Sequence, residues 1–101
     1  MDKITVENVN QPGWSGRVDA AKYSAMRHAM ITALKIQSDP LDSKAIKQEV
    51  KPLLPENLFP GGATSGWWIK CVQLDLEAKG ILARTTEKPL RFYLTPGPHD
   101  G

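Results

Sequence analysis

The chain has 101 residues, 41% of them hydrophobic, and this length suits one domain with a single small core. Its formal net charge of +2 permits nucleic-acid binding without demanding it. The single cysteine, Cys71, excludes an internal disulfide, and the isolated His28 and His99 lack zinc-ligand spacing, so we expect no metal and no cofactor. No window approaches the roughly 18 consecutive apolar residues of a membrane span, and no signal peptide opens the chain, which predicts a cytoplasmic protein without membrane contact.

The first predicted element is an N-terminal arm or short strand over residues 1–18. Polar residues alternate there with apolar ones, and a Gln-Pro-Gly turn follows. Asp19 then offers an N-cap, and apolar residues recur at helical spacing, which predicts an amphipathic helix over 20–36. The apolar residues of that helix are Tyr23, Met26, Met30, Ala33 and Leu34.

A second helix is expected over 43–53. Asp42 repeats the capping device, and Pro52 limits the helix because proline lacks a backbone donor and clashes with the preceding turn. Its apolar stripe consists of Ile46, Val50 and Leu53.

A loop rich in proline and glycine precedes the third predicted helix, over 65–79. Thr64 or Ser65 can cap its start, and Gly80 suits a left-handed residue at its end. Two short strands within 81–95, joined by a polar loop, then predict a hairpin, and residues 96–101 are expected to form a flexible tail. The predicted fold class is mainly α with a small antiparallel β-hairpin.

The stretch LEAKGILAR, residues 76–84, resembles the end of the recognition helix and the entry to the wing in winged helix-turn-helix domains. The resemblance implies a winged-helix domain over 19–95, with three helices and a wing. The segments VENVNQPGW, RVDAAKY, FPGGATSGWWIKCVQLDLEAKG and PLRF also resemble an uncharacterised family of small, mostly bacterial proteins. The winged-helix resemblance implies binding of duplex DNA through the third helix and the wing.

Residues of three kinds carry the DNA-binding hypothesis. The glycine-rich turn before the third helix offers free backbone donors to a phosphate, the polar flank of that helix offers long side chains to base edges, and the wing has a net charge of +2. The expected DNA-binding residues are Ser65, Lys70, Gln73, Arg84, Lys88 and Arg91.

The third helix carries apolar residues on two opposite sides. Ile69, Val72 and Leu76 form the stripe expected to face the core. The opposite stripe consists of Trp67, Cys71, Leu74 and Ala78. The polar flanks between the stripes hold Lys70, Gln73 and Glu77 on one side and Trp68, Asp75 and Lys79 on the other.

Three occupants can cover this second stripe. They are the N-terminal segment, a second copy of the chain, or DNA, whose thymine methyl groups accept apolar contact. The leading interpretation, which rests on the winged-helix resemblance and on the basic wing, is a non-enzymatic winged-helix DNA-binding protein, a regulator of transcription. The alternative is a protein-interaction or dimerisation module, in which the second stripe contacts a protein partner or forms a homodimer. No acid/base pair or activated nucleophile stands out, so we expect no catalytic residues and no enzyme activity.

Overall fold

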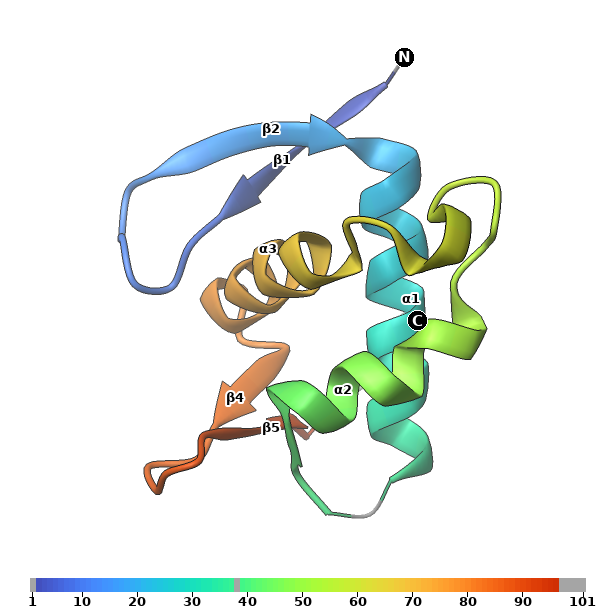
Figure 1. Cartoon of the computed structure of the whole chain (residues 1–101). Coiled ribbons are helices and arrows are strands. Elements are labelled where there is room, and N and C mark those ends of the chain that lie inside the picture. The colour runs from blue at the N-terminus through green and yellow to red at the C-terminus, as the bar shows by residue number, and fades with distance from the viewer. Residues whose placement is uncertain (1, 38, 97–101) are drawn as a thin grey trace.

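The computed structural model of the chain describes residues 2–37 and 39–96. Within these ranges the chain folds into three α-helices and two small antiparallel sheets, an α+β arrangement in which the helices cross one another around a shared core (Figure 1). The predicted class, mainly α with one hairpin, gave the helices correctly but omitted part of the β-structure. The predicted tail falls almost wholly on residues 97–101, which lie outside the described residues.

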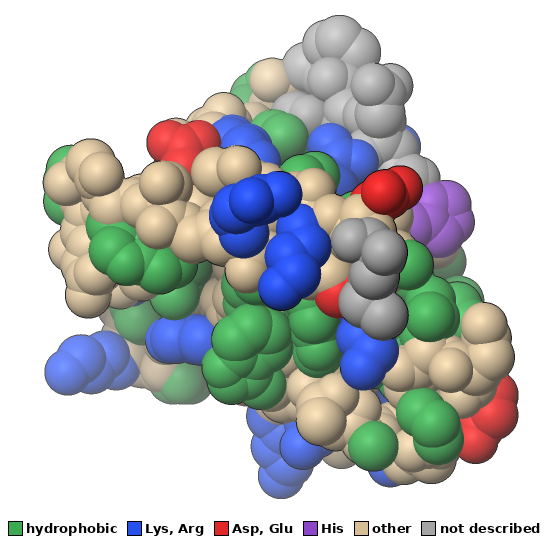
Figure 2. All heavy atoms as spheres, turned by 90° about the horizontal axis from the view of Figure 1, so that it is seen from above, with side chains coloured by type: hydrophobic (Ala, Val, Ile, Leu, Met, Phe, Trp, Pro, Cys, Tyr) green, Lys and Arg blue, Asp and Glu red, His purple; other side chains and the backbone are tan. Residues whose placement is uncertain are grey.

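The N-terminal arm is a β-hairpin rather than a single strand. β1 (Lys3–Glu7) pairs antiparallel with β2 (Ser15–Asp19), and the turn between them includes Gly13 at a φ of 88°. Val6 is buried and Ile4 packs against the core, because alternate residues of a strand point to opposite faces. The other face of the hairpin is exposed. Viewed from above, on this side of the molecule, hydrophobic side chains form separate surface patches among Lys and Arg (Figure 2).

Helix α1 (Ala20–Ile36) has the predicted bounds. Its N-cap is Asp19, whose Oδ1 accepts hydrogen bonds from the backbone nitrogens of Ala21 at 2.9 Å and Lys22 at 3.1 Å. The predicted apolar residues are all buried: Tyr23, Met26, Met30, Ala33 and Leu34. The capping residue and the helical periodicity therefore located this element correctly.

Helix α2 (Ser43–Val50) is shorter than predicted, because the chain continues as a 3-10 turn, η1 (Lys51–Leu53), around Pro52. Asp42 caps the helix as predicted and accepts a hydrogen bond from Ala45 N at 2.8 Å. The tighter turn takes Leu53 out of the apolar stripe. Its side chain is 42% exposed, so its predicted place on the stripe with Ile46 and Val50 was wrong.

Helix α3 (Ser65–Ala78) follows a second 3-10 turn, η2 (Pro60–Gly62). Thr64 occupies the N-cap position with a left-handed φ of 61°, and its hydroxyl donates to Ala63 O instead of capping the helix. The predicted side-chain cap is therefore wrong. The predicted left-handed glycine after the end of the helix is present, since Gly80 has a φ of 75°.

The C-terminal hairpin consists of β4 (Leu82–Arg84) and β5 (Arg91–Leu94), as predicted. A short strand that was not predicted, β3 (Leu41–Asp42), pairs with the other edge of β5, so the sheet order is β3-β5-β4. Two residues carry too little periodicity to be recognised as a strand in a sequence.

The core forms where the three helices meet. Ile69, Val72 and Leu76 of α3 are at most 5% exposed, so the stripe predicted to face inward does so. The same cluster contains buried residues of the other elements: Leu34, Ile46, Val50 and Leu82. Among the described residues no helix is long and apolar enough to cross a membrane.

Candidate functional site

Most sides of helix α3 are covered by other parts of the chain. The core stripe packs inward, and three residues of the two flanks between the stripes, Trp68, Gln73 and Asp75, are buried as well. On one flank Trp68 is 7% exposed and Asp75 is fully buried; on the other, Gln73 is 2% exposed. Solvent therefore reaches α3 mainly along the second apolar stripe and at Lys70.

Asp75 ties α3 to the N-terminal hairpin and to α1. Its Oδ1 accepts a hydrogen bond from Glu7 N at 2.8 Å. Its Oδ2 accepts one from the Tyr23 hydroxyl and one from Lys79 Nζ, the latter at 2.8 Å. Burial, together with this hydrogen bond, raises the pKa of Tyr23, which keeps the hydroxyl protonated as a donor. The network is structural, because each of these polar groups already has its partner.

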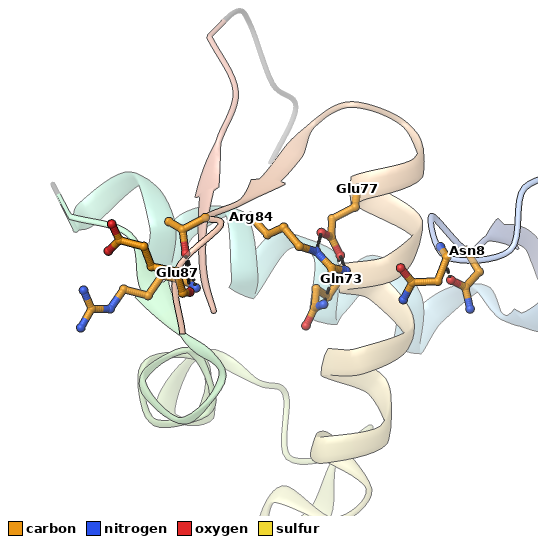
Figure 3. A network of polar contacts seen from close by, with 8 residues as sticks. Asn8, Gln73, Glu77, Arg84 and Glu87 are labelled. Atoms are coloured by element: carbon orange, nitrogen blue, oxygen red, sulfur yellow. Dashed lines mark hydrogen bonds and ion pairs between the residues drawn. The ribbon is translucent and has the colours of Figure 1, made fainter. Parts of the chain in front are cut away.

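Glu77 forms a second cluster on the opposite flank, toward the C-terminal hairpin. Arg84 reaches from β4 and donates from Nε to Glu77 Oε1 and from Nη2 to Oε2, while Gln73 Nε2 donates to Oε2 at 3.1 Å (Figure 3). The guanidinium also lies 5.9 Å from the ring centroid of Phe92. The hydrogen bonds to Glu77 raise the pKa of Arg84.

Two of the residues that were expected to contact DNA, Gln73 and Arg84, instead bind Glu77 within the protein. Gln73 is buried and bonded to Glu77, so the expectation that it extends from an exposed flank was wrong. Arg84 has its charge matched by Glu77 in a two-point ion pair, the geometry in which arginine and carboxylate interact most strongly. Arg84 holds the C-terminal hairpin against α3, whereas the bond between Gln73 and Glu77 lies within α3.

A basic groove lies between α2, α3 and the C-terminal hairpin β4–β5. It has a volume of about 480 Å³ and is lined by Lys44 of α2, Lys70 of α3 and Lys88 of the loop between β4 and β5. An adjoining hollow of about 160 Å³ adds Lys47. All four lysines are exposed, and the single carboxylate among the lining residues belongs to Asp42, which caps α2. The fold thus gathers four lysines from three elements around two adjoining hollows, and Arg84, whose charge Glu77 matches, also lines the groove.

Sequence reasoning found half of this cluster. Lys70 and Lys88 were expected DNA-binding residues, whereas Lys44 and Lys47 were missed. The available signal was their spacing, since two lysines three positions apart lie on the same side of a helix. That signal becomes informative only once α2 is placed beside α3.

The remaining two expected DNA-binding residues lie apart from the groove. Ser65 is buried, 4% exposed, at the start of α3. Arg91 is exposed on β5 and lines a different hollow, together with Asp39 and Asp42. Neither is among the residues that line the basic groove.

The second apolar stripe of α3 is partly covered by the N-terminal hairpin. The backbone of Val9 donates to Leu74 O at 3.3 Å, and Leu74 and Cys71 are half-buried. Trp67 remains 59% exposed and Ala78 is exposed as well. The hairpin therefore covers one side of the stripe and leaves the rest open.

Between hairpin and helix lies an apolar slot of about 190 Å³, with Trp14 on the hairpin side and Trp67 on the helix side. Cys71 also lines it, and burial, aided by the nearby charge of Asp75, raises the pKa of its thiol. A raised pKa keeps the thiol in its unreactive protonated form. Among the described residues no three His, Cys, Asp or Glu side chains gather as a metal site.

The fold and these surfaces define a small α+β protein in which a basic groove and an apolar slot lie on opposite sides of one exposed helix face. The chain belongs to DUF6958, a family of unknown function whose model matches residues 3–92. No curated protein and no solved structure matches it.

Proposed function

We propose that the chain is a winged-helix protein that binds duplex DNA without catalysis, through the basic groove between α2, α3 and the wing. The observation that carries the proposal is the set of four exposed lysines around this groove, with no acidic side chain among the lining residues except a helix cap. Duplex DNA carries a dense array of phosphates, and lysine amines bind them as point charges. The chain thus acts as a DNA-binding regulator.

The arrangement of elements supports the winged-helix part of this proposal. The hairpin β4–β5 follows the third helix directly, as the resemblance of LEAKGILAR to a helix and wing entry implies. The wing is held against α3 by the pair of Arg84 and Glu77, so its loop and Lys88 keep a defined position beside the helix. A fixed spacing between helix and wing is what a rigid duplex requires.

The same geometry favours contacts to the phosphate backbone over recognition of bases. Gln73 is buried, and the exposed face of α3 otherwise carries Trp67 and half-buried Leu74 beside Lys70. Apolar side chains can contact thymine methyl groups but form no hydrogen bonds with base edges. We therefore propose binding that is strong at low salt and weakly dependent on sequence.

The test is a fluorescence-anisotropy titration of a random-sequence duplex at two salt concentrations. Four lysine–phosphate contacts give a slope of log K against log salt of about −3.6, or roughly a hundredfold loss between about 50 mM and about 200 mM salt. Lys44→Ala and Lys88→Ala should each weaken binding and make the slope less steep by about 0.9.

Lys3→Ala is the matched control, because Lys3 is an exposed lysine of the N-terminal hairpin, outside the groove. It changes the net charge by the same amount and should leave the slope unchanged. Two results contradict the proposal: no binding by the wild type at the lower salt, or equal losses for Lys3→Ala and Lys44→Ala. The second result would indicate attraction by net charge alone.

A further inference from the structure

The apolar slot continues into a longer surface along α3. Beyond the slot, a second hollow of about 270 Å³ is lined by Val9, Pro12, Trp14 and Ala78. Glu7, Asn8 and Trp14 line both hollows, so together they form one strip from Trp67 at the start of the helix to Ala78 at its end. We call this strip the tryptophan strip.

Opposite charges border the tryptophan strip. Glu7 lies on its hairpin side and Lys70 on its helix side, and both line the slot. Both residues are exposed, and within the described part of the chain no ion pair joins them to each other or to another residue. An apolar strip with an acid on one side and a base on the other is complementary to a second copy of itself.

We propose that the tryptophan strip is a homodimer interface, in which two copies pack about a twofold axis. In such an interface residue i of one copy contacts residue j of the other, and j contacts i. Glu7 of each copy then faces Lys70 of the other, which gives two equivalent ion pairs on either side of a shared apolar centre. A partner of unrelated sequence has no reason to match this charge order.

The two tryptophans are fixed before association. The ring of Trp67 stands edge-to-face against the buried Trp68, with 5.0 Å between the ring centroids. The ring of Trp14 lies over Gly16, so close that a Cβ at this glycine would be 2.7 Å from the ring atom Cη2. Large aromatic side chains that are already ordered lose little entropy on binding, and such residues dominate the affinity of protein interfaces.

The experiment measures the association state by sedimentation for the wild type, Glu7→Lys, Lys70→Glu and an equimolar mixture of the two variants. The wild type should dimerise. In each single variant both ion pairs become like-charge pairs, so its dimer dissociation constant should rise by about tenfold or more. In a heterodimer from the mixture, one copy carries lysine at both positions and the other carries glutamate at both. Opposite charges then face each other in both pairs, so the heterodimer should form with nearly wild-type affinity.

Two further variants complete the design. Trp67→Ala should yield monomer, since it removes the more exposed of the two tryptophans of the strip. Glu49→Lys on the exposed surface of α2 makes the same charge change as Glu7→Lys and should dimerise normally. Circular dichroism should be unchanged in the charge variants, because neither the Glu7 carboxylate nor the Lys70 amine has an ion pair to lose among the described residues. The mixture of Glu7→Lys and Lys70→Glu identifies the pairing of residues 7 and 70, because a variant that failed to dimerise through misfolding would not regain dimerisation when the other variant is added.

A monomeric wild type at every protein concentration overturns this proposal. So does a mixture that remains as monomeric as its components, or a set of charge variants that dimerise as tightly as the wild type. The proposal does not depend on DNA binding: Glu7 lies outside the basic groove, and the groove variants Lys44→Ala and Lys88→Ala leave the strip intact.

Discussion

Replacing Asp75 by alanine tests whether the buried carboxylate holds the N-terminal hairpin to the rest of the fold. The side chain is fully buried, and its oxygens accept hydrogen bonds from the Tyr23 hydroxyl, from Glu7 N and from Lys79 Nζ. The substitution leaves each of these donors without its acceptor and opens a small cavity between β1, α1 and α3.

The expected loss in the free energy of unfolding is the sum of the costs at the three donors that bind Asp75. The Tyr23 hydroxyl is buried, so leaving it unpaired costs about 1–3 kcal/mol, and the half-exposed amide of Glu7 costs about 1 kcal/mol. The Lys79 side chain is 35% exposed and can turn to water, so its pair contributes at most about 0.5 kcal/mol. The sum is about 3 kcal/mol, a large share of the roughly 5–15 kcal/mol that stabilises a domain of this size.

A urea titration followed by circular dichroism at neutral pH measures this loss, with Tyr23→Phe and Lys79→Ala as graded controls. Tyr23→Phe removes one donor and should cost about 1–2 kcal/mol, and Lys79→Ala should cost less than about 0.5 kcal/mol. The amide of Glu7 should also exchange with solvent faster in Asp75→Ala. A loss below about 1 kcal/mol, or no difference between Asp75→Ala and Lys79→Ala, would refute the clamping role.

The remaining predictions concern the core, the residue Thr64 before α3 and the C-terminal hairpin. Leu76→Ala should lower the free energy of unfolding by about 2–5 kcal/mol in urea, and a loss below about 1 kcal/mol would mean that another stripe supports the core. Thr64→Gly should raise the free energy of unfolding by up to about 1 kcal/mol, since a β-branched residue is strained at a φ of 61°. A lower free energy of unfolding in this variant would contradict that strain. Arg84→Ala should lower the free energy of unfolding by about 1–3 kcal/mol, because it leaves Glu77 without its main partner; a loss below about 0.5 kcal/mol would show that this pair does not hold the C-terminal hairpin against α3.

The elements with strong local signals were predicted well from the sequence. Asp19 and Asp42 cap the helices they were expected to cap, and Gly80 ends α3 in the left-handed conformation. Each of these signals acts between residues close in the chain. Where the local signal was ambiguous the prediction failed: Leu53 left the apolar stripe because Pro52 tightened the turn.

The candidate site depends on contacts between distant residues, which a sequence alone does not display. Asp75 lies 68 positions from Glu7 along the chain, and only the fold shows that its carboxylate meets that backbone. In the same way, Arg84 was assigned to DNA from its charge, whereas the fold places Glu77 beside it. The apolar stripe through Trp67 was recognised because its period lies within one helix.

Lys70 connects the two proposals, since it lines both the basic groove and the slot of the tryptophan strip. Its single ammonium group cannot give its full charge to a phosphate and to a partner's carboxylate at once. If both proposals hold, the duplex and the second copy compete for this residue. Binding free energies are reciprocal, so the duplex must weaken the dimer by the same factor by which dimerisation weakens duplex binding. Lys44 acts on DNA alone and Glu7 on the dimer alone, which makes these two residues, rather than Lys70, the ones whose substitution separates the functions.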